Sequence, residues 1–164
     1  MSPEVDIRPM SAADFESFWP TFRAIVHARD SYAIDPDIDF ESARAYWLEQ
    51  PLQTQAAFVD GQLAGSYYLK PNFGGPADHI CNCGYMVDAR FRNLGTARRM
   101  CEHSLEAARR AGFRAMQFNC VVASNIPAIH LWQSLGFDTI GRIPKAYRHR
   151  DRGLTDALVM YREL

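Results

Sequence analysis

The junction between residues 87 and 95 narrows the possible folds more than any other part of the sequence. The run HICNCGYMV, at residues 79–87, is typical of a β-strand that ends near Val87. From residue 95 to residue 111 the apolar side chains recur at helical spacing, and Gly112 is placed to end a helix. The chain must therefore pass from a strand, through a short turn, directly into a helix. This arrangement predicts a domain in which helices pack on a sheet.

The remaining strands follow from short apolar runs bounded by turn residues. Besides the strand at residues 79–87, strands are expected at residues 5–8, 115–123, 137–143 and 154–164. A hairpin is expected at residues 55–70, because Asp60 and Gly61 suit a tight turn between its two apolar runs. Gly84 indicates a bulge or a close approach to the backbone.

Three further helices are indicated by capping residues and by proline. A capping box beginning at Ser11 starts a helix that runs to about residue 29, and Pro20 is expected to break or kink it. Asp39 is typical of the first cap of a second helix, which runs to about residue 50. Pro127 suits the first turn of the last helix. The elements then follow the order β, α, α, β, β, β, α, β, α, β, β, which predicts an α/β protein with a mixed sheet flanked by helices.

Length and composition predict one globular domain spanning residues 1–164. The formal net charge of -1 gives no basic field, so neither nucleic acid nor an anionic membrane is expected as a partner. No apolar run approaches the roughly 20 residues of a membrane span. The N-terminus lacks the pattern of a signal peptide, so a cytoplasmic location is expected.

The cysteines do not form a metal-binding pattern. Cys81 and Cys83 are too close for a zinc knuckle and no second pair follows, so no metal is expected. We expect buried or half-buried free thiols at all four cysteine positions, which also include Cys101 and Cys120.

The turn before the third helix has the features of an anion site. The first amides of a helix have no partner within the helix and lie at the positive end of its dipole. Gly95 lets a ligand approach the backbone, and Arg92 can pair with phosphate oxygens. The run matches neither a P-loop nor a dinucleotide fingerprint.

Two motifs and the order of the elements resemble the GNAT superfamily of acyl-CoA N-acyltransferases. Residues 92–97 show the pattern R-x-x-G-x-A, and residues 125–137, NIPAIHLWQSLGF, resemble the second motif of that superfamily. The resemblance covers nearly the whole chain. It implies a mixed, mostly antiparallel seven-stranded sheet, about four helices, and a splay between the fourth and fifth strands. It also implies acetyl-CoA as co-substrate.

The resemblance assigns the cofactor-binding residues one by one. The pyrophosphate is expected on the backbone of the turn, the pantetheine arm beside the end of the fourth strand, and the second motif on the other side of the cofactor. The residues implied are Met86, Val87, Arg92, Asn93, Leu94, Gly95, Thr96, Ala97, Asn125, Ala128 and Trp132. Asn125 can also serve simply as a helix cap.

The residues available for proton transfer differ from those of the GNAT motif that the chain resembles. Trp132 stands where the motif has a tyrosine that often protonates the CoA thiolate, and indole is no useful proton source. It can instead contact the sulfur, pack the slot or be part of the core. The fourth strand carries no carboxylate to act as a base. His79 is one possible base, although a surface role is the alternative.

A narrower resemblance concerns the acceptor. Asn82, Asn119 and Asn125 resemble the asparagine set of acetyltransferases that act on azetidine-2-carboxylate and related proline analogues. In that branch the first two orient the substrate, and here they are the candidate catalytic residues. The alternative is that Asn82 and Asn119 satisfy backbone groups at a bulge. A basic run at residues 145–152 can bind a substrate carboxylate, and the loop at residues 30–39 can form the other wall.

The function expected is the transfer of an acetyl group from acetyl-CoA to a small amine, an amino acid or a proline-like compound, by direct attack. Backbone N–H groups near Val87 would hold the oxyanion. Two alternatives stay open: acetylation of a protein N-terminus or lysine, and a non-catalytic acetyl-CoA-binding regulatory module. The small-molecule amine is the expected partner, and a homodimer is left open.

Overall fold

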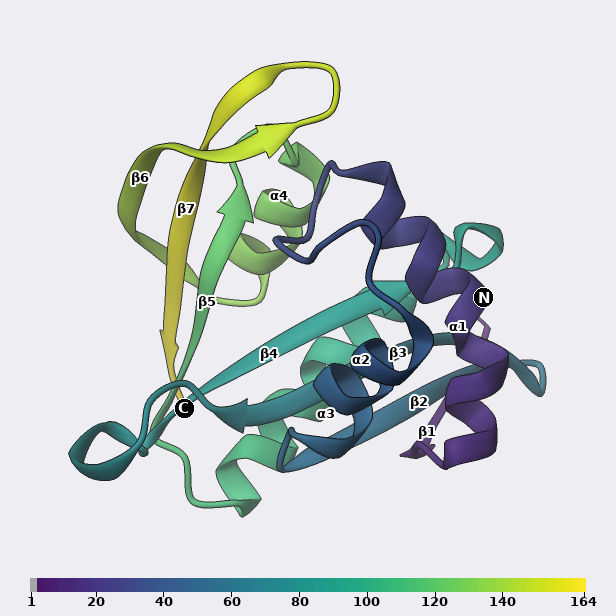
Figure 1. The fold of residues 1–164 in the computed structure, drawn as a ribbon. Helices are drawn as coiled ribbons and strands as arrows, with labels where there is room; N and C mark the ends of the chain where they lie inside the picture. The colour runs from purple at the N-terminus through teal and green to yellow at the C-terminus, as the bar shows by residue number, and fades with distance from the viewer. Residues whose placement is uncertain (1–2) are drawn as a thin grey trace.

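The computed structural model describes residues 3–164 and contains one seven-stranded sheet with the strand order β1-β2-β3-β4-β5-β7-β6 (Figure 1). The strands are β1 (Val5–Pro9), β2 (Gln53–Val59), β3 (Gln62–Pro71), β4 (Ile80–Val87), β5 (Ala115–Val122), β6 (Asp138–His149) and β7 (Gly153–Glu163). All neighbouring pairs are antiparallel except β4 and β5. The expected fold class and element order are therefore confirmed.

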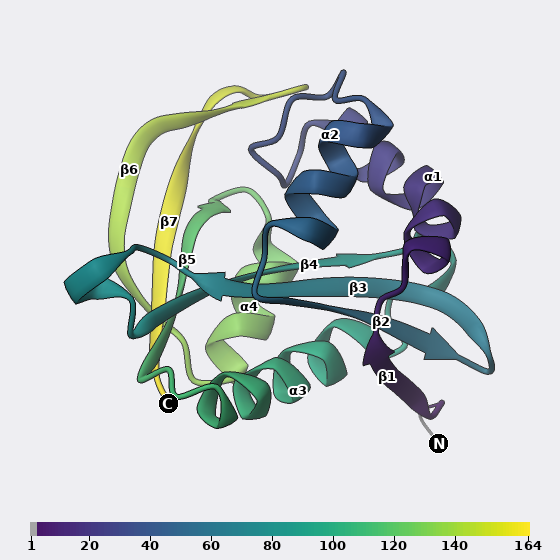
Figure 2. The same cartoon turned by 60° about the horizontal axis from the view of Figure 1, so that its bottom comes forward.

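Helices cover both faces of the sheet. They are α1 (Ala12–Ala28), α2 (Phe40–Arg44), α3 (Thr96–Arg110) and α4 (Ile126–Ser134), with a π-helical turn η1 (Ala45–Glu49) after α2 and the 3-10 turns η2 (Gly75–Ala77) and η3 (Ala89–Phe91). Figure 2 shows α1 and α2 on one side of β1–β4, and α3 and α4 on the other. Each side has its own apolar core, one centred on Trp47 and the α1 phenylalanines, the other on α3, α4 and β5.

The parallel pair is short, and this creates the splay that the resemblance implied. β4 and β5 pair only at Ile80 with Ala115 and at Cys81 with Met116. Beyond these positions the two strands diverge, and Figure 1 shows them separating toward their C-terminal ends. β5 also has an irregularity between Phe118 and Val121 where it pairs with β7. The backbone edge of β4 is therefore left without a strand neighbour from residue 82 onward.

Pro20 does not break α1, which corrects the expectation. The helix is assigned continuously from Ala12 to Ala28, and its capping box at Ser11 is present. A proline inside a helix costs about 3 kcal/mol. Phe15, Phe18 and Phe22 are fully or almost fully buried along one face of α1, and each such burial contributes roughly 1.5–3 kcal/mol. The apolar contacts of this face therefore outweigh the loss of one hydrogen bond.

The remaining expectations about local structure are largely confirmed. Asp60 and Gly61 both have positive φ, 49° and 75°, in the turn between β2 and β3. Gly84 marks no bulge, and the close approach there involves a side chain, because a Cβ on Gly84 would lie 2.6 Å from Cε1 of Tyr68. β6 is longer than expected and contains the first part of the basic run.

Candidate active site

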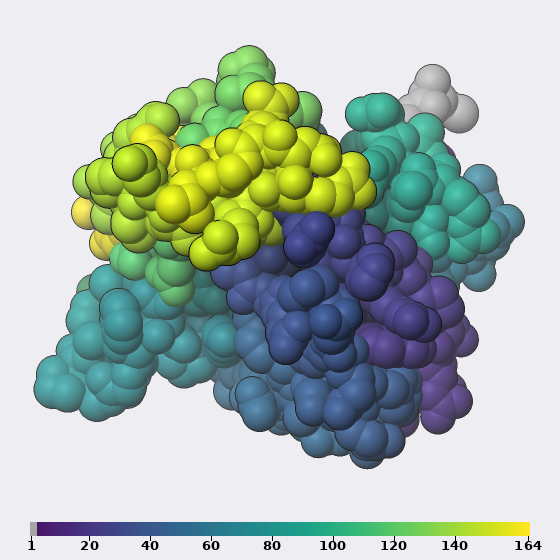
Figure 3. All heavy atoms as spheres, turned by 45° about the horizontal axis from the view of Figure 1, so that its top comes forward, coloured from purple at the N-terminus to yellow at the C-terminus, as the bar shows by residue number. Residues whose placement is uncertain are grey.

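A cavity of about 1270 Å³ occupies the splay. Its walls come from β4 and β5, the turn before α3, the start of α4, the end of β3, the loop at residues 30–34, and the turn between β6 and β7. Figure 3 shows the β6–β7 turn, in yellow, lying against the loop that follows α1, in dark blue. The N–H of Arg150 donates to the carbonyl of Arg29 at 3.0 Å and joins the two segments. These two segments therefore form one continuous wall of the cavity.

The turn before α3 has the geometry of an anion site. Gly95 is the residue before the first turn of α3 and has a φ of 81°, a conformation that favours glycine. A Cβ built on Gly95 would meet nothing within 4 Å, so the space above its backbone is open. Five of the six residues in the expected phosphate turn line the cavity; Leu94 is partly exposed and does not.

An Asp88 carboxylate fixes the start of this turn. It accepts hydrogen bonds from the Thr21 hydroxyl at 2.7 Å, from the backbone N–H of Arg90 at 2.9 Å, and from the Arg90 guanidinium at 3.0 Å and 3.1 Å. The Arg90 guanidinium is the largest influence, and together these donors lower the pKa of Asp88 to about 2. Asp88 therefore ties the end of β4, the turn and α1 together as an ionised group.

Tyr32 caps the free edge of β4. Its hydroxyl donates to the backbone carbonyl of Tyr85 at 2.5 Å and accepts from the N–H of the same residue at 2.6 Å. Burial raises the pKa of Tyr32 well above its usual value, so the hydroxyl stays protonated. Its own carbonyl accepts from the Tyr147 hydroxyl at 3.1 Å. No local pattern in the sequence signals a role for Tyr32, because its partner lies far away along the chain.

The two candidate catalytic asparagines both line the cavity, but they make different contacts. Asn82 is buried; its amide oxygen accepts from the Tyr68 hydroxyl at 2.9 Å, and its amide nitrogen donates to the Gln117 carbonyl at 2.9 Å. Asn119 is exposed and bonds to the side chains of Gln117 and Asn72. Asn82 thus satisfies a backbone group of β5 at the splay, in line with the structural alternative.

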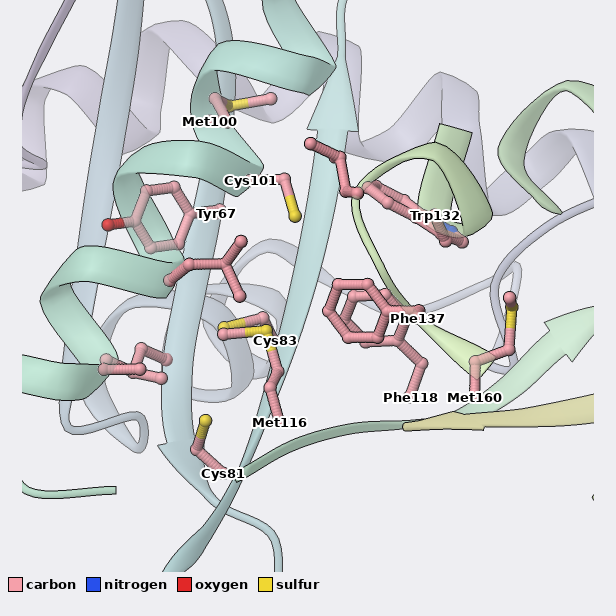
Figure 4. Close-up of a cluster of buried hydrophobic side chains, with 14 of the residues drawn as sticks. Tyr67, Cys81, Cys83, Met100, Cys101, Met116, Phe118, Trp132, Phe137 and Met160 are labelled. Atoms are coloured by element: carbon pink, nitrogen blue, oxygen red, sulfur yellow. The ribbon is translucent and has the colours of Figure 1, made fainter. Parts of the chain in front are cut away.

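The start of α4 forms the opposite wall. Asn125 caps α4 through a bond from the Ala128 N–H at 3.4 Å, and both residues line the cavity with Trp132. Trp132 is 9% exposed, and its ring lies 5.1 Å from that of Tyr85 and 5.0 Å from that of Phe118. Figure 4 shows it beside Phe118 and Phe137. Trp132 is therefore both a core residue and part of the cavity wall.

The cysteines are free thiols, as expected. Cys81, Cys83 and Cys101 are buried, in the core that Figure 4 shows, and Cys120 is half-buried. Burial raises the pKa of Cys101 to about 11 and that of Cys83 well above its ordinary value. The Cys83 and Cys101 thiols therefore stay protonated near neutral pH, which is unsuitable for a nucleophile.

For His79 the surface alternative is the one that fits, and the expected position of the basic run needs correction. His79 is exposed before β4 and lies outside the cavity lining, because it precedes the point where β4 and β5 diverge. In the basic run, only His149 and Arg152 line the cavity; Lys145 and Arg148 lie in β6 and are exposed. The run does not lie wholly between the last two strands, because β6 continues through residue 149.

The described part of the chain offers neither a metal cluster nor a membrane span. Among residues 3–164, no group of three or more His, Cys, Asp and Glu side chains is arranged to hold a metal ion. In the same range no helix is both long enough and apolar enough to cross a membrane.

Comparisons with known proteins agree on one family. Residues 15–137 match the model of the Acetyltransferase (GNAT) family. The N-acetyltransferase aca1 of Schizosaccharomyces pombe is 31% identical over 156 residues, which are 94% of this chain and 68% of that protein. A GCN5-related N-acetyltransferase from Kribbella flavida is 40% identical, with a TM-score of 0.93 over 98% of both chains. The yncA protein of Salmonella typhimurium, solved with its cofactor acetyl-CoA, is 19% identical, with a TM-score of 0.86 over 98% of this chain and 94% of that one, and shares the fold.

Proposed function

The chain belongs to the GNAT family and is an acetyl-CoA-dependent N-acetyltransferase, and we propose that its acceptor is a small amine, in particular an amino acid or a proline-like compound. The observation that carries this proposal is the cover over the acceptor end of the cavity. The loop at residues 30–34 and the β6–β7 turn both line the cavity. They are held together by hydrogen bonds from Arg150 to Arg29, which directly precedes the loop, and from Tyr147 of β6 to Tyr32. A covered cavity suits a small molecule better than a peptide, which needs an open groove.

The proposed position of the cofactor follows the shape of the cavity. The phosphates would lie on the first amides of α3, where Gly95 leaves open space and Arg92 adds positive charge. The pantetheine arm would run beside Met86 and Val87, along the β4 edge that β5 leaves free. Asn125, Ala128 and Trp132 would line its other side. This arrangement brings the thioester to the middle of the splay, between the two strands.

The reaction proposed is direct attack of the neutral amine on the thioester carbon. The C–N bond forms, the carbonyl oxygen becomes an oxyanion, and the C–S bond then breaks to release the CoA thiolate, which takes up the proton lost by the amine. The backbone N–H of Val87 lies at the free edge and is the proposed donor to the oxyanion; removing one such donor typically costs about 100-fold or more in kcat. Trp132 would contact the sulfur without supplying a proton.

Asn82 and Asn119 are proposed to hold the acceptor. Both line the cavity at its acceptor end, and both are uncharged, so they can bind a zwitterion without protonating its amine. We expect Asn82→Ala and Asn119→Ala each to lower kcat/KM for the acceptor by about tenfold. Asn82→Ala should also lower the melting temperature, because it removes two hydrogen bonds of a buried side chain. Unchanged kcat/KM in both variants would leave the asparagines a structural role alone.

The test of the function is an acceptor panel. Purified protein is incubated with acetyl-CoA and single amines, amino acids, cyclic imino acids, a peptide with a free N-terminus and a lysine peptide, and free thiol is measured. Turnover of small amines well above that of either peptide supports the proposal. Turnover of a peptide alone would make the protein a peptide acetyltransferase, and binding of acetyl-CoA with no turnover would make it a regulatory module.

Two further parts of the proposal concern the protein in the cell. We place it in the cytoplasm, where acetyl-CoA is at hand and free thiols such as those of Cys81 and Cys83 persist. A homodimer is the proposed assembly, because Ile140, Ile143 and Leu154 expose apolar surface on the β6–β7 hairpin. Light scattering in solution tests the assembly, and a monomer at high concentration would reject it.

A further inference from the structure

A chain of side-chain amides runs along the acceptor end of the cavity and stops at an unused donor. The Gln117 amide nitrogen donates to the Asn119 oxygen at 3.0 Å, and the Asn119 amide nitrogen donates to the Asn72 oxygen at 2.7 Å. The next donor in this direction is the Asn72 amide nitrogen. This nitrogen is buried, and among the described residues it has no hydrogen-bond partner.

The Asn72 amide nitrogen is a buried donor that lacks an acceptor within the described part of the chain. A buried N–H without an acceptor costs about 1–3 kcal/mol, and native proteins rarely leave one unpaired. Asn72 lines the cavity. Reversing its amide alone would place a nitrogen toward the donating nitrogen of Asn119, so the orientation of Asn72 is tied to those of Asn119 and Gln117. The nitrogen itself has almost no accessible surface, so an oxygen of a bound molecule would complete the chain after a small rotation of the Asn72 side chain toward the cavity.

Lys70 brings a positive charge to the same end of the cavity. It lies two residues before Asn72, is half-buried, and lines the cavity. Its ammonium is 5.2 Å from the ring centre of Tyr46 and 5.0 Å from that of Tyr68. Within residues 3–164, no carboxylate forms an ion pair with Lys70. The two rings hold the charge in place without neutralising it.

The sheet register places this charge beside the asparagines. Lys70 of β3 pairs directly with Asn82 of β4. The hydroxyl of Tyr68, whose ring lies near the ammonium, donates to the oxygen of Asn82. Side chains of directly opposed residues on one face of a sheet lie about 5 Å apart at Cβ. The unpaired cation and the unused amide therefore belong to one small region of the cavity wall.

We propose that Lys70 and Asn72 form the subsite for the carboxylate of an amino-acid acceptor, one oxygen taking the ammonium of Lys70 and the other the free N–H of Asn72. This inference rests on the proposed function and specifies the acceptor class further. Asn119 then has a second role besides its own proposed contact with the acceptor, because it holds the Asn72 oxygen and so orients that side chain. The basic run at residues 145–152 is not needed for this contact.

The experiment compares matched acceptors on matched variants. The best amino acid of the panel and its primary carboxamide differ in the charged oxygen and in the basicity of the amine, and the second difference cancels when each variant is compared with the wild type on the same acceptor. Lys70→Gln and Asn72→Ala are expected to lower kcat/KM for the amino acid at least about tenfold, since a hydrogen bond to a charged group is worth about 1.5–3 kcal/mol. For the carboxamide, Lys70→Gln should change kcat/KM by less than about threefold. Lys70→Arg should restore most of the preference, because it keeps the charge.

Lys145 provides a control within the chain. It is the only other lysine in the sequence, it is exposed, and it lies outside the cavity. Lys145→Gln removes the same charge and is expected to leave both acceptors unaffected. Melting temperature and the KM for acetyl-CoA are measured for every variant, so that a folding defect shows itself in both.

The outcomes separate this inference from the proposed function. If the enzyme acetylates small amines but Lys70→Gln affects the acid and the carboxamide equally, the carboxylate subsite is wrong and the small-amine function stands. If Lys145→Gln removes the preference for the acid as Lys70→Gln does, the preference reflects the overall charge of the protein, and the subsite at Lys70 is wrong. If only a peptide is acetylated, both the proposed function and the subsite are wrong.

Discussion

In the proposed cofactor site, Gly95 would connect the backbone conformation of one residue to the binding of acetyl-CoA. We expect Gly95→Val to weaken acetyl-CoA binding by at least tenfold, about 1.4 kcal/mol, because the branched side chain enters the open space above the first turn of α3. Gly112→Val is the matched control. Gly112 also has a positive φ, 89°, and a Cβ there would likewise meet nothing within 4 Å, but it lies at the other end of α3.

Both glycine variants carry the strain of a β-branched residue at positive φ, so similar losses of melting temperature are expected. Isothermal titration calorimetry on the folded proteins separates strain from binding. Equal affinity of the two variants for acetyl-CoA would remove the turn from the cofactor site.

Trp132 tests the proton chemistry. Trp132→Phe keeps an aromatic ring among Tyr85, Phe118 and Phe137, so the fold should survive. Because indole donates no proton under these conditions, the pH–rate profile should keep its shape while kcat falls through lost packing. The measurement is kcat/KM across pH with the best acceptor. Loss of the basic limb in the variant would assign Trp132 a part in proton transfer.

Single residues are also where prediction from sequence reaches its limit. The anion turn and the asparagines can be found, because each is part of a local pattern. Tyr32, Lys70 and Asn72 cannot, because each matters through a partner that only the folded chain brings near. Tyr32 meets Tyr85, and Asn72 meets Asn119, across the sheet. No periodicity within a segment reports such contacts.

At the scale of elements, Asp88 at the start of the η3 turn should make the free energy of unfolding depend on pH. The folded-state pKa of Asp88 is lowered to about 2, whereas an unfolded aspartate titrates near about 4. Its stabilising effect is therefore fully present above about pH 4 and is lost as the pH falls toward 2. Asp88→Asn should melt earlier than the wild type at neutral pH, and the difference should shrink as the pH is lowered through this range. A difference that stays constant down to pH 2 would contradict the assignment.

The boundaries of a strand or helix are harder to predict from the sequence than its presence, as β6 illustrates. The expected strand at residues 137–143 ends before Pro144, since proline cannot donate to a ladder. β6 continues past it because β6 is an edge strand, and the register shift between Ile143 and Tyr147 takes up Pro144 and Lys145. Lys145 has a φ of 51°, as expected at such an irregularity. Whether a strand lies at the edge is a property of the sheet and not of the segment.

At the scale of the whole molecule, the sheet consists of two parts with a narrow connection. β1–β4 and β5–β7 are joined by strand pairing only at Ile80 and Cys81, with the Asn82 amide just beyond. The order of the elements and the splay could be predicted from the sequence by resemblance. The covering of the cavity could not, because it depends on how a loop near residue 32 meets a turn near residue 150.

A ligand in the splay should stabilise both parts together. We expect acetyl-CoA to slow hydrogen exchange in the second half of β4 and in α4, and to leave β1 and β2 unchanged, because only the former line the cavity. Exchange measured by mass spectrometry with and without acetyl-CoA tests this. Uniform slowing over the entire chain would indicate global stabilisation and not a ligand located in the splay.

The double hydrogen bond of Tyr32 has a consequence for the order of events in a catalytic cycle. This hydroxyl takes the place of the strand neighbour that β4 lacks at Tyr85. A molecule that forms hydrogen bonds with the same backbone groups of Tyr85 must displace the Tyr32 hydroxyl. Two hydrogen bonds are then replaced by two others, at little net cost in free energy. The loop that carries Tyr32 keeps its hydrogen bonds from Tyr147 and Arg150, so it stays in place as a wall of the cavity. Binding of the acyl donor would thus release the Tyr32 hydroxyl within the covered cavity, where it becomes a partner for the amine, so the amine would bind better after the donor than before it.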